Sequence, residues 1–294
     1  KQSGLLTSYI YKKQEYIHNG QGPQPFFWRA PTDNDYGAKL PTRLKAWREA
    51  SYQTPKAESF NVSKDGYKSI VKVTYRFPQV DAQWEITYKV FANGIIKVDN
   101  RFVAEGTETP MIPRVGLRMQ LSEILNDLTY YGRGPEENYR DRRTSQFIGE
   151  YTTPIKDLYE PYIRPQENEH RTDIYWCALT TKQKAGLLFI ADRTFELNAS
   201  NYLLGSLDSG ETIDNGAPRT NETNHRHLTD PQPVKQVDMF IDYRMMGVGG
   251  DNSWGAIAHE PYLIRPGVEN AIEYGFSSVP FDKKADYKNL IYQY

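Results

Sequence analysis

Residues 71–77 read Val-Lys-Val-Thr-Tyr-Arg-Phe, an alternation of apolar and polar side chains. Such a two-residue period predicts a strand with one face buried and the other in water. The alternation returns in residues 84–90 and 96–102, which flank Asn93-Gly94, a pair suited to the positive φ angles of a tight turn. The three runs therefore predict antiparallel strands, two of them joined as a hairpin.

Further apolar or alternating runs lie outside this hairpin, separated by Gly, Pro, Asn and Asp; they are residues 115–121, 186–191, 237–243 and 272–279. Helical signal is short. Its best stretch is residues 42–50, where Thr42 is the expected cap and Leu44 and Trp47 share one face. Many strands without βα alternation predict an all-β fold of stacked antiparallel sheets, because one flat sheet of this size would leave an apolar face in water.

Composition limits the partners. The chain has 36 Lys and Arg against 37 Asp and Glu, a net charge of −1, which favours neutral ligands over nucleic acid or an anionic membrane. No apolar run approaches the roughly 20 residues that span a bilayer. The one cysteine, Cys177, cannot form a disulfide within the chain and leaves the compartment open, cytoplasm or periplasm. The opening Lys1, with no signal-like stretch after it, suggests a piece of a longer polypeptide.

Five segments are too polar and too rich in Pro, Gly and aromatic residues for core strands; they are residues 26–37, 131–143, 161–171, 221–228 and 247–254. Loops on a rigid β scaffold often carry binding groups. Their mixture of Trp, Tyr, Asp, Asn, Arg and His suits a carbohydrate, which offers both hydroxyl groups and an apolar face. These segments are the candidate binding loops.

Two of the loops also have structural interpretations, which local chemistry favours. Residues 33–35 carry acceptors able to bind hydroxyls or a hard cation, but Asp and Asn commonly make turns with nearby backbone. The many charges of residues 134–142 predict an internal network of salt bridges and hydrogen bonds.

Two other candidate loops contain histidine and tryptophan residues that could take part in a site. His225 and His227 lie on one side of an extended segment, but with no third Cys or His nearby a structural pair is favoured over a metal site. Residues 249–254 end in Trp254 after two glycines and Asp251. Stacking of Trp254 on a sugar and burial of Trp254 in the core are equally favoured.

In order along the chain, the loops resemble the C-terminal domain of bacterial family 2 β-galactosidases. The resemblance rests on five blocks: Arg29-Ala30-Pro31-x-Asp33-Asn34-Asp35-x-Gly37, Gly134-Pro135-x-Glu137-Asn138-Tyr139-x-Asp141-Arg142, Pro161-Tyr162 with Pro165-x-Glu167-Asn168, His225-Arg226-His227-Leu228, and Gly249-Gly250-Asp251-x-Ser253-Trp254. It implies that residues 1–294 form a single C-terminal domain, a large antiparallel β-supersandwich of the galactose-mutarotase-like type. In the parent enzyme this domain would follow a catalytic (β/α)₈ barrel and other domains.

The implied activity is retaining hydrolysis of terminal β-D-galactosides by two glutamates about 5 Å apart. In the family these glutamates belong to the barrel, so we expect no catalytic residue here and no activity of the isolated chain. The domain would contribute to the sugar site and to subunit contacts of a homo-oligomeric parent. The chain itself needs no cofactor, whereas Mg²⁺ and Na⁺ or Ca²⁺ are expected as options in the parent.

The resemblance also implies site residues. Trp254 would form a wall of the sugar site, and residues 37–43 would be a mobile loop hinged at Gly37 and stiffened by Leu40-Pro41. The full set of expected substrate-binding residues is Trp254, Asp251, Asp33, Asn34, Gly37 and Arg43. Weak metal candidates are the backbone oxygens near Arg164, Pro165, Thr220 and Thr223.

Two other functions stay open. One is a stand-alone aldose 1-epimerase, with His225 or His227 as the acid and Glu167 as the base. The other is a carbohydrate-binding module without an attached enzyme.

Overall fold

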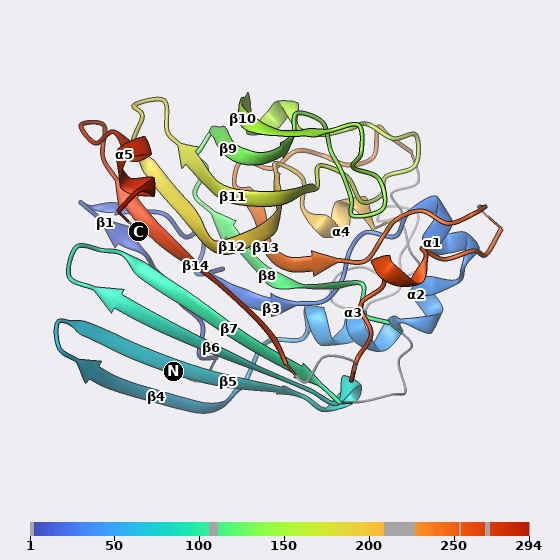
Figure 1. Cartoon of the computed structure of the whole chain (residues 1–294), viewed down its shortest axis with the longest axis horizontal. Helices are drawn as coiled ribbons and strands as arrows, with labels where there is room; N and C mark the ends of the chain where they lie inside the picture. Colours follow the sequence, from blue (N-terminus) through green and yellow to red (C-terminus); the bar gives the residue numbers. More distant parts are fainter. Residues whose placement is uncertain (1–2, 106–110, 209–226, 253, 268–270, 294) are drawn as a thin grey trace.

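The computed structural model describes residues 3–105, 111–208, 227–252, 254–267 and 271–293. In this part of the chain, 12 strands form one antiparallel sheet in the order β10-β9-β11-β12-β14-β7-β6-β5-β4, from which β13, β8 and β3 branch at β12. The pair β1 and β2 makes a separate two-stranded ribbon. The prediction of a large antiparallel all-β fold is therefore confirmed (Figure 1).

The strands are β1 Ile10–Tyr11, β2 Gln14–Glu15, β3 Gln24–Phe26, β4 Ala57–Asp65, β5 Lys68–Phe77, β6 Ala82–Phe91, β7 Ile96–Ala104, β8 Arg114–Leu121, β9 Asp127–Gly134, β10 Phe147–Pro154, β11 Arg171–Thr180, β12 Gly186–Ser200, β13 Val237–Met245 and β14 Ile272–Phe281. The helices are α1 Asp33–Gly37, α2 Leu40–Arg43, α3 Lys45–Tyr52, α4 Leu204–Leu207 and α5 Tyr287–Ile291, with 3₁₀ turns at Pro78–Val80, Ile155–Asp157 and Glu260–Tyr262. No helix in the described ranges is long and apolar enough to cross a bilayer.

The quoted alternation forms β5 as predicted. Val73, Tyr75 and Phe77 are buried, and Lys72 and Arg76 are exposed, whereas Thr74, expected on the face in water, is buried. The predicted hairpin is β6–β7, and Gly94 has the expected positive φ of 92°. The four other predicted runs are found in β8, β12, β13 and β14.

β12 gives the sheet its two layers. Residues 186–191 pair with β14 and residues 196–200 pair with β13, which in turn pairs with β8, whereas β11 pairs with β12 at positions from Gly186 to Leu197. One continuous strand therefore takes part in both layers, where the sequence predicted separate stacked sheets. Between the layers lies one apolar core, in which the ring of Phe27 is 5.0–5.6 Å from those of Trp47, Phe77, Trp84 and Phe102.

The structure corrects two predictions on local elements. Thr42 does not cap the helix, because it lies inside α2, and α3 begins only at Lys45. Leu44 and Trp47 are nevertheless both fully buried, as their shared face predicted. Residues 131–134 of the second candidate loop and Phe26 of the first belong to strands β9 and β3.

Phe27→Ala should remove the ring at the centre of this core and leave a cavity. We expect the free energy of unfolding to fall by roughly 3–5 kcal/mol, the usual cost of such a truncation. Urea denaturation measures the change. Phe147→Ala is the matched control because Phe147 is 74% exposed, and its effect should stay within about 0.5 kcal/mol. Equal losses in the two variants would contradict the described core.

Candidate functional site

Arg29 joins the first candidate loop to the last one. Its guanidinium donates two hydrogen bonds to Asp35, at 2.8 and 3.0 Å, and further ones to the backbone oxygens of Met246 and Gly247, at 2.6 and 3.0 Å. The side chain is only 2% exposed. Because Arg29 also donates to backbone oxygens more than 200 positions away, it fixes the position of the start of residues 247–254.

Asp141 holds the same segment from the second loop. Its carboxylate accepts hydrogen bonds from the backbone N–H groups of Val248 and Gly249, at 3.1 and 2.8 Å. Asn34 adds a side-chain hydrogen bond to the Val248 oxygen at 3.1 Å. A Cβ on Gly247 would lie 2.5 Å from the Asp141 carboxylate, so only glycine fits there. Three blocks that are far apart in the sequence thus meet at one place.

The predicted network of residues 134–142 is confirmed in part, because Glu137 pairs with Arg142 inside the loop whereas most other partners lie outside it. Glu137 accepts hydrogen bonds from Arg142, from the Tyr162 hydroxyl and, at 2.9 Å, from the Glu169 backbone N–H. Asn138 is fully buried and accepts from both the backbone and the hydroxyl of Thr172. These charges therefore hold the loops together.

Beneath the loops lies a buried cluster of charges. Arg114 is fully buried, 3.1 Å from Asp242 and 3.5 Å from Glu167. The Arg114–Asp242 pair is close but not aligned as a hydrogen bond. Burial raises the pKa of Asp242 to about 7, although the charge of Arg114 opposes this rise.

His170 lies in the same cluster. Its ring nitrogens are 2.7 Å from Asn198 and 3.1 Å from Glu196, and its ring stacks on Tyr139. Burial alone would lower the pKa of His170, but the hydrogen bond and negative charge of Glu196 outweigh burial and raise it. Neither His170 nor Glu196 was singled out from the sequence, because a buried histidine and its partner on another strand leave no local pattern.

Trp254 is not a core residue, since it is 91% exposed. The segment that follows β13 reaches out beside α1 and α2 (Figure 1), and the backbone at Gly255 lies close to Gly37, since a Cβ there would be 3.7 Å from the Gly37 oxygen. Asp251 is also exposed, with its carboxylate 2.8 Å from a ring nitrogen of His259. The structure thus brings Trp254, Gly37 and Asn34 to one end of the molecule.

The other expected binding residues lie in or next to short helices. Asp33 is exposed in the first turn of α1 and accepts hydrogen bonds from Arg164 and Gln166 at 3.4 and 3.2 Å. Arg43 is exposed and donates to the Ala38 oxygen. In the expected loop over residues 37–43, α2 occupies the second half with Pro41 in the first turn, where proline's missing N–H is not needed. The mobility of this loop stays a prediction. The positive φ in this stretch belongs to Lys39, not to Gly37.

The metal candidates are only partly described. Arg164 lies over the ring of Tyr36 at 3.8 Å, and Pro165 is buried. Thr220, Thr223 and His225 fall outside the described residues, whereas His227 is exposed beside Thr229. Among the residues with described positions, no three His, Cys, Asp or Glu side chains are grouped to hold a metal ion.

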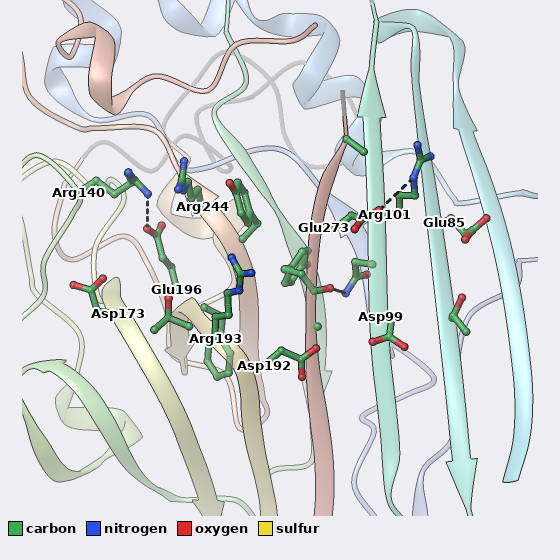
Figure 2. Close-up of a pocket in the computed structure, with 18 of the residues that line it drawn as sticks. Glu85, Asp99, Arg101, Arg140, Asp173, Asp192, Arg193, Glu196, Arg244 and Glu273 are labelled. Atoms are coloured by element: carbon green, nitrogen blue, oxygen red, sulfur yellow. Dashed lines mark hydrogen bonds and ion pairs between the residues drawn. The ribbon is translucent and has the colours of Figure 1, made fainter. Parts of the chain in front are cut away.

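A large hollow lies elsewhere. A groove of about 910 Å³ follows one face of the sheet across β6, β7, β14, β12 and β13 (Figure 2). Its charged lining residues are Glu85, Asp99, Arg101, Arg140, Arg143, Asp173, Asp192, Arg193, Glu196, Arg244 and Glu273. Only Arg140 and Arg143 lie in a candidate loop from the sequence. The others lie on strands, where charged side chains are typical of an ordinary solvent-facing surface.

Comparison with known proteins gives a family match over most of the chain. Residues 1–277 match the family model described as beta galactosidase small chain. The β-galactosidase of Priestia megaterium is 32% identical over 264 residues, 90% of this chain, and that of Streptococcus thermophilus is 31% identical over 264 residues, 88% of this chain. The chain spans only 24% of the length of each of these relatives.

Similar solved structures include an aldose epimerase homologue from C. elegans, with a TM-score of 0.41 and 11% identity over 94% of this chain and 78% of that chain. The galactose 1-epimerase from Lactobacillus acidophilus gives a TM-score of 0.43 and 7% identity over 78% of this chain and 67% of that chain. These similarities assign no epimerase residue to this chain.

The buried cluster predicts how stability depends on pH. Asp242 and His170 both have a raised pKa in the folded state, so the folded protein binds protons more tightly than the unfolded chain does. The stabilisation from Asp242 is lost as pH rises from about 4 towards its folded pKa of about 7, and that from His170 is lost as pH rises through its own raised pKa. We expect the free energy of unfolding, measured in urea, to fall between about pH 5 and pH 8.

In Asp242→Asn the decline should be shallower, because an amide does not titrate, even though the variant is less stable overall. Glu123→Gln, at an exposed position, is the control and should keep the original slope. A slope that is unchanged in Asp242→Asn would contradict the assignment.

Proposed function

Because the chain belongs to the β-galactosidase small chain family, matched over residues 1–277, we propose that it serves as the C-terminal domain of a retaining, family 2 β-galactosidase. The substrate would be a terminal β-D-galactoside. The observation that carries the proposal is the family match together with the 24% share of each relative that the chain spans. Other parts of the protein would be the immediate partners of this domain, and the complete protein would be a homo-oligomer.

Within that enzyme, Trp254 would form one wall of the sugar site. Its ring is 91% exposed, and the segment before it is held by Asp141 and Asn34. An exposed aromatic ring on a loop held by hydrogen bonds suits stacking on the apolar face of a sugar or its aglycone. Such a loop loses little conformational freedom when the sugar binds. Asp251 and Asp33 have exposed carboxylates that can accept hydrogen bonds from sugar hydroxyls. The further proposed contacts are Asn34, Gly37 and Arg43.

The catalytic glutamates would come from another part of the protein. Retaining hydrolysis needs two carboxyl groups about 5–5.5 Å apart with access to the sugar. Two glutamates of the candidate loops are already engaged, Glu137 by Arg142 and Tyr162, and Glu167 by Asn198 and Arg114. Any Mg²⁺ and Na⁺ or Ca²⁺ belong to the proposal for the complete protein.

An epimerase function gains no support from the described residues. Glu167, its proposed base, is 4% exposed and hydrogen-bonded to Asn198 at 2.9 Å, and His227 is exposed beside Thr229. A carbohydrate-binding module remains the alternative, because a stacking Trp254 would serve such a module equally well.

The isolated chain of 294 residues should not hydrolyse a chromogenic β-galactoside, because it would lack the catalytic pair. Activity should appear only after the upstream barrel-containing portion is added. Assays of the purified chain, of that portion and of their mixture measure this. Hydrolysis by the chain alone would overturn the proposal, and an active barrel portion unaffected by the chain would remove the role in the sugar site.

Trp254→Ala in the complete enzyme should raise KM by about two- to tenfold, because aromatic contacts contribute about 0.5–1.5 kcal/mol and act on bound substrate and transition state alike. Because the ring is exposed, the melting temperature should not change. Steady-state kinetics with a galactoside measures the effect. Tyr292→Ala removes another exposed ring, 89% exposed, and should leave KM unchanged. An unaltered KM in Trp254→Ala would exclude the stacking role.

A further inference from the structure

Trp254 lies at the tip of an exposed loop beside α1 (Figure 1). The limb before the tip is held by Asp141 and Asn34, whose hydrogen bonds reach no further along it than Gly249. The limb after the tip returns to the body of the protein at Ala258, which is buried. The exposed stretch between these two anchors therefore needs contacts of its own to hold Trp254 in place.

His259 and Asp251 make the contact that closes this loop. The Nε2 atom of His259 lies 2.8 Å from a carboxylate oxygen of Asp251. The two limbs also approach each other at the backbone, because a Cβ on Gly250 would lie 2.8 Å from the oxygen of Ala256. The loop is therefore narrow, and the hydrogen bond between His259 and Asp251 joins its two limbs.

The indole ring of Trp254 has little other support. The ring is 91% exposed, so packing against the body of the protein contributes little to its position. The backbone N–H of Trp254 donates to the side chain of Asn252 at 2.9 Å, a contact within the tip itself. Gly255 follows with a φ of 139°, in a region that glycine adopts readily and other residues rarely do. The position of the ring therefore depends on how firmly the loop is closed.

We propose that His259 is a positioning residue, which holds Trp254 ready to stack on a sugar by closing the loop through Asp251. The proposal rests on the stacking role of Trp254 proposed above and adds a residue that acts without touching the sugar. A loop that is closed before binding loses less conformational entropy when the ligand arrives. One carboxylate oxygen of Asp251 serves this contact, and the other stays available to a sugar hydroxyl.

The first test measures the motion of the Trp254 indole in the 294-residue chain without any sugar. The other four tryptophans are buried, and the Trp254 indole N–H signal is identified by its loss in Trp254→Ala. In ¹⁵N relaxation experiments, His259→Ala should lower the order parameter of this N–H into the flexible range, below about 0.6. His259→Gln should restore it, because the glutamine amide also donates to a carboxylate. An order parameter that is unchanged in His259→Ala would overturn the proposal.

The second test is steady-state kinetics of the complete enzyme with a galactoside. His259→Ala should raise KM about two- to fivefold at unchanged kcat, the size of effect that an exposed charged contact supports. The increase should vanish when Trp254→Ala is already present, because the two residues act as a unit. An increase that persists in that background, or an unchanged KM in His259→Ala where Trp254→Ala raises KM, would overturn the proposal.

Glu260→Gln is the matched control. It weakens an exposed ion pair with Arg265, 2.7 Å long, which begins at the next residue but does not cross the loop. KM and the indole order parameter should both stay unchanged, and equal melting temperatures would show that all variants fold. Effects as large as those of His259→Ala would overturn the proposal. If Trp254→Ala leaves KM unchanged, the stacking role fails, and the relaxation experiment alone decides whether His259 positions the ring.

Discussion

The structure depends on one strand that pairs with three others. β12 is 15 residues long, and it meets β14 along its first part, β13 along its last part, and β11 at positions from Gly186 to Leu197. Its backbone hydrogen bonds therefore join the two layers that enclose the core. Its side chains serve both of the regions discussed above, with Asn198 in the buried cluster and Arg193 and Glu196 in the groove.

Buried charge, rather than apolar contact alone, positions the loops. Removing charges from water costs several kcal/mol per ion unless partners compensate. Here Arg29 is compensated by Asp35 and two backbone oxygens, and Arg114 by Asp242, Glu167 and Asn198. Because a buried charge without its partner is so unfavourable, such pairs select one arrangement of the loops over slightly shifted ones.

The sequence predicted those parts of the fold that have strong local patterns. The β6–β7 hairpin followed from alternation and a turn pair, and burial of Leu44 and Trp47 followed from their spacing. The sequence predicted only residues 186–191 of β12, because the exposed residues 192–194 interrupt its apolar pattern. The mostly exposed strands β4 and β10 lie at the sheet edges, where alternation is weak.

The loops of the candidate site could be predicted from the sequence, but the contacts that bring these loops together could not. The five blocks were visible as polar and aromatic segments, yet the contact between Asn34 and Val248 joins residues 214 positions apart, and no local pattern encodes it. The groove was missed for a different reason. Most of its charges lie on strands, as Asp99 and Arg101 do on β7, at positions where charged side chains normally face water.

The position of β14 has a consequence for how the polypeptide is made. This last strand of the described chain lies between β12 and β7, not at an edge of the sheet. Until residue 281 has left the ribosome, β7 and β12 each present an unpaired edge, because residues 272–281 of β14 pair with both. Synthesis from the N-terminus would therefore yield a nascent chain open to wrong strand pairing, for which a chaperone would be useful.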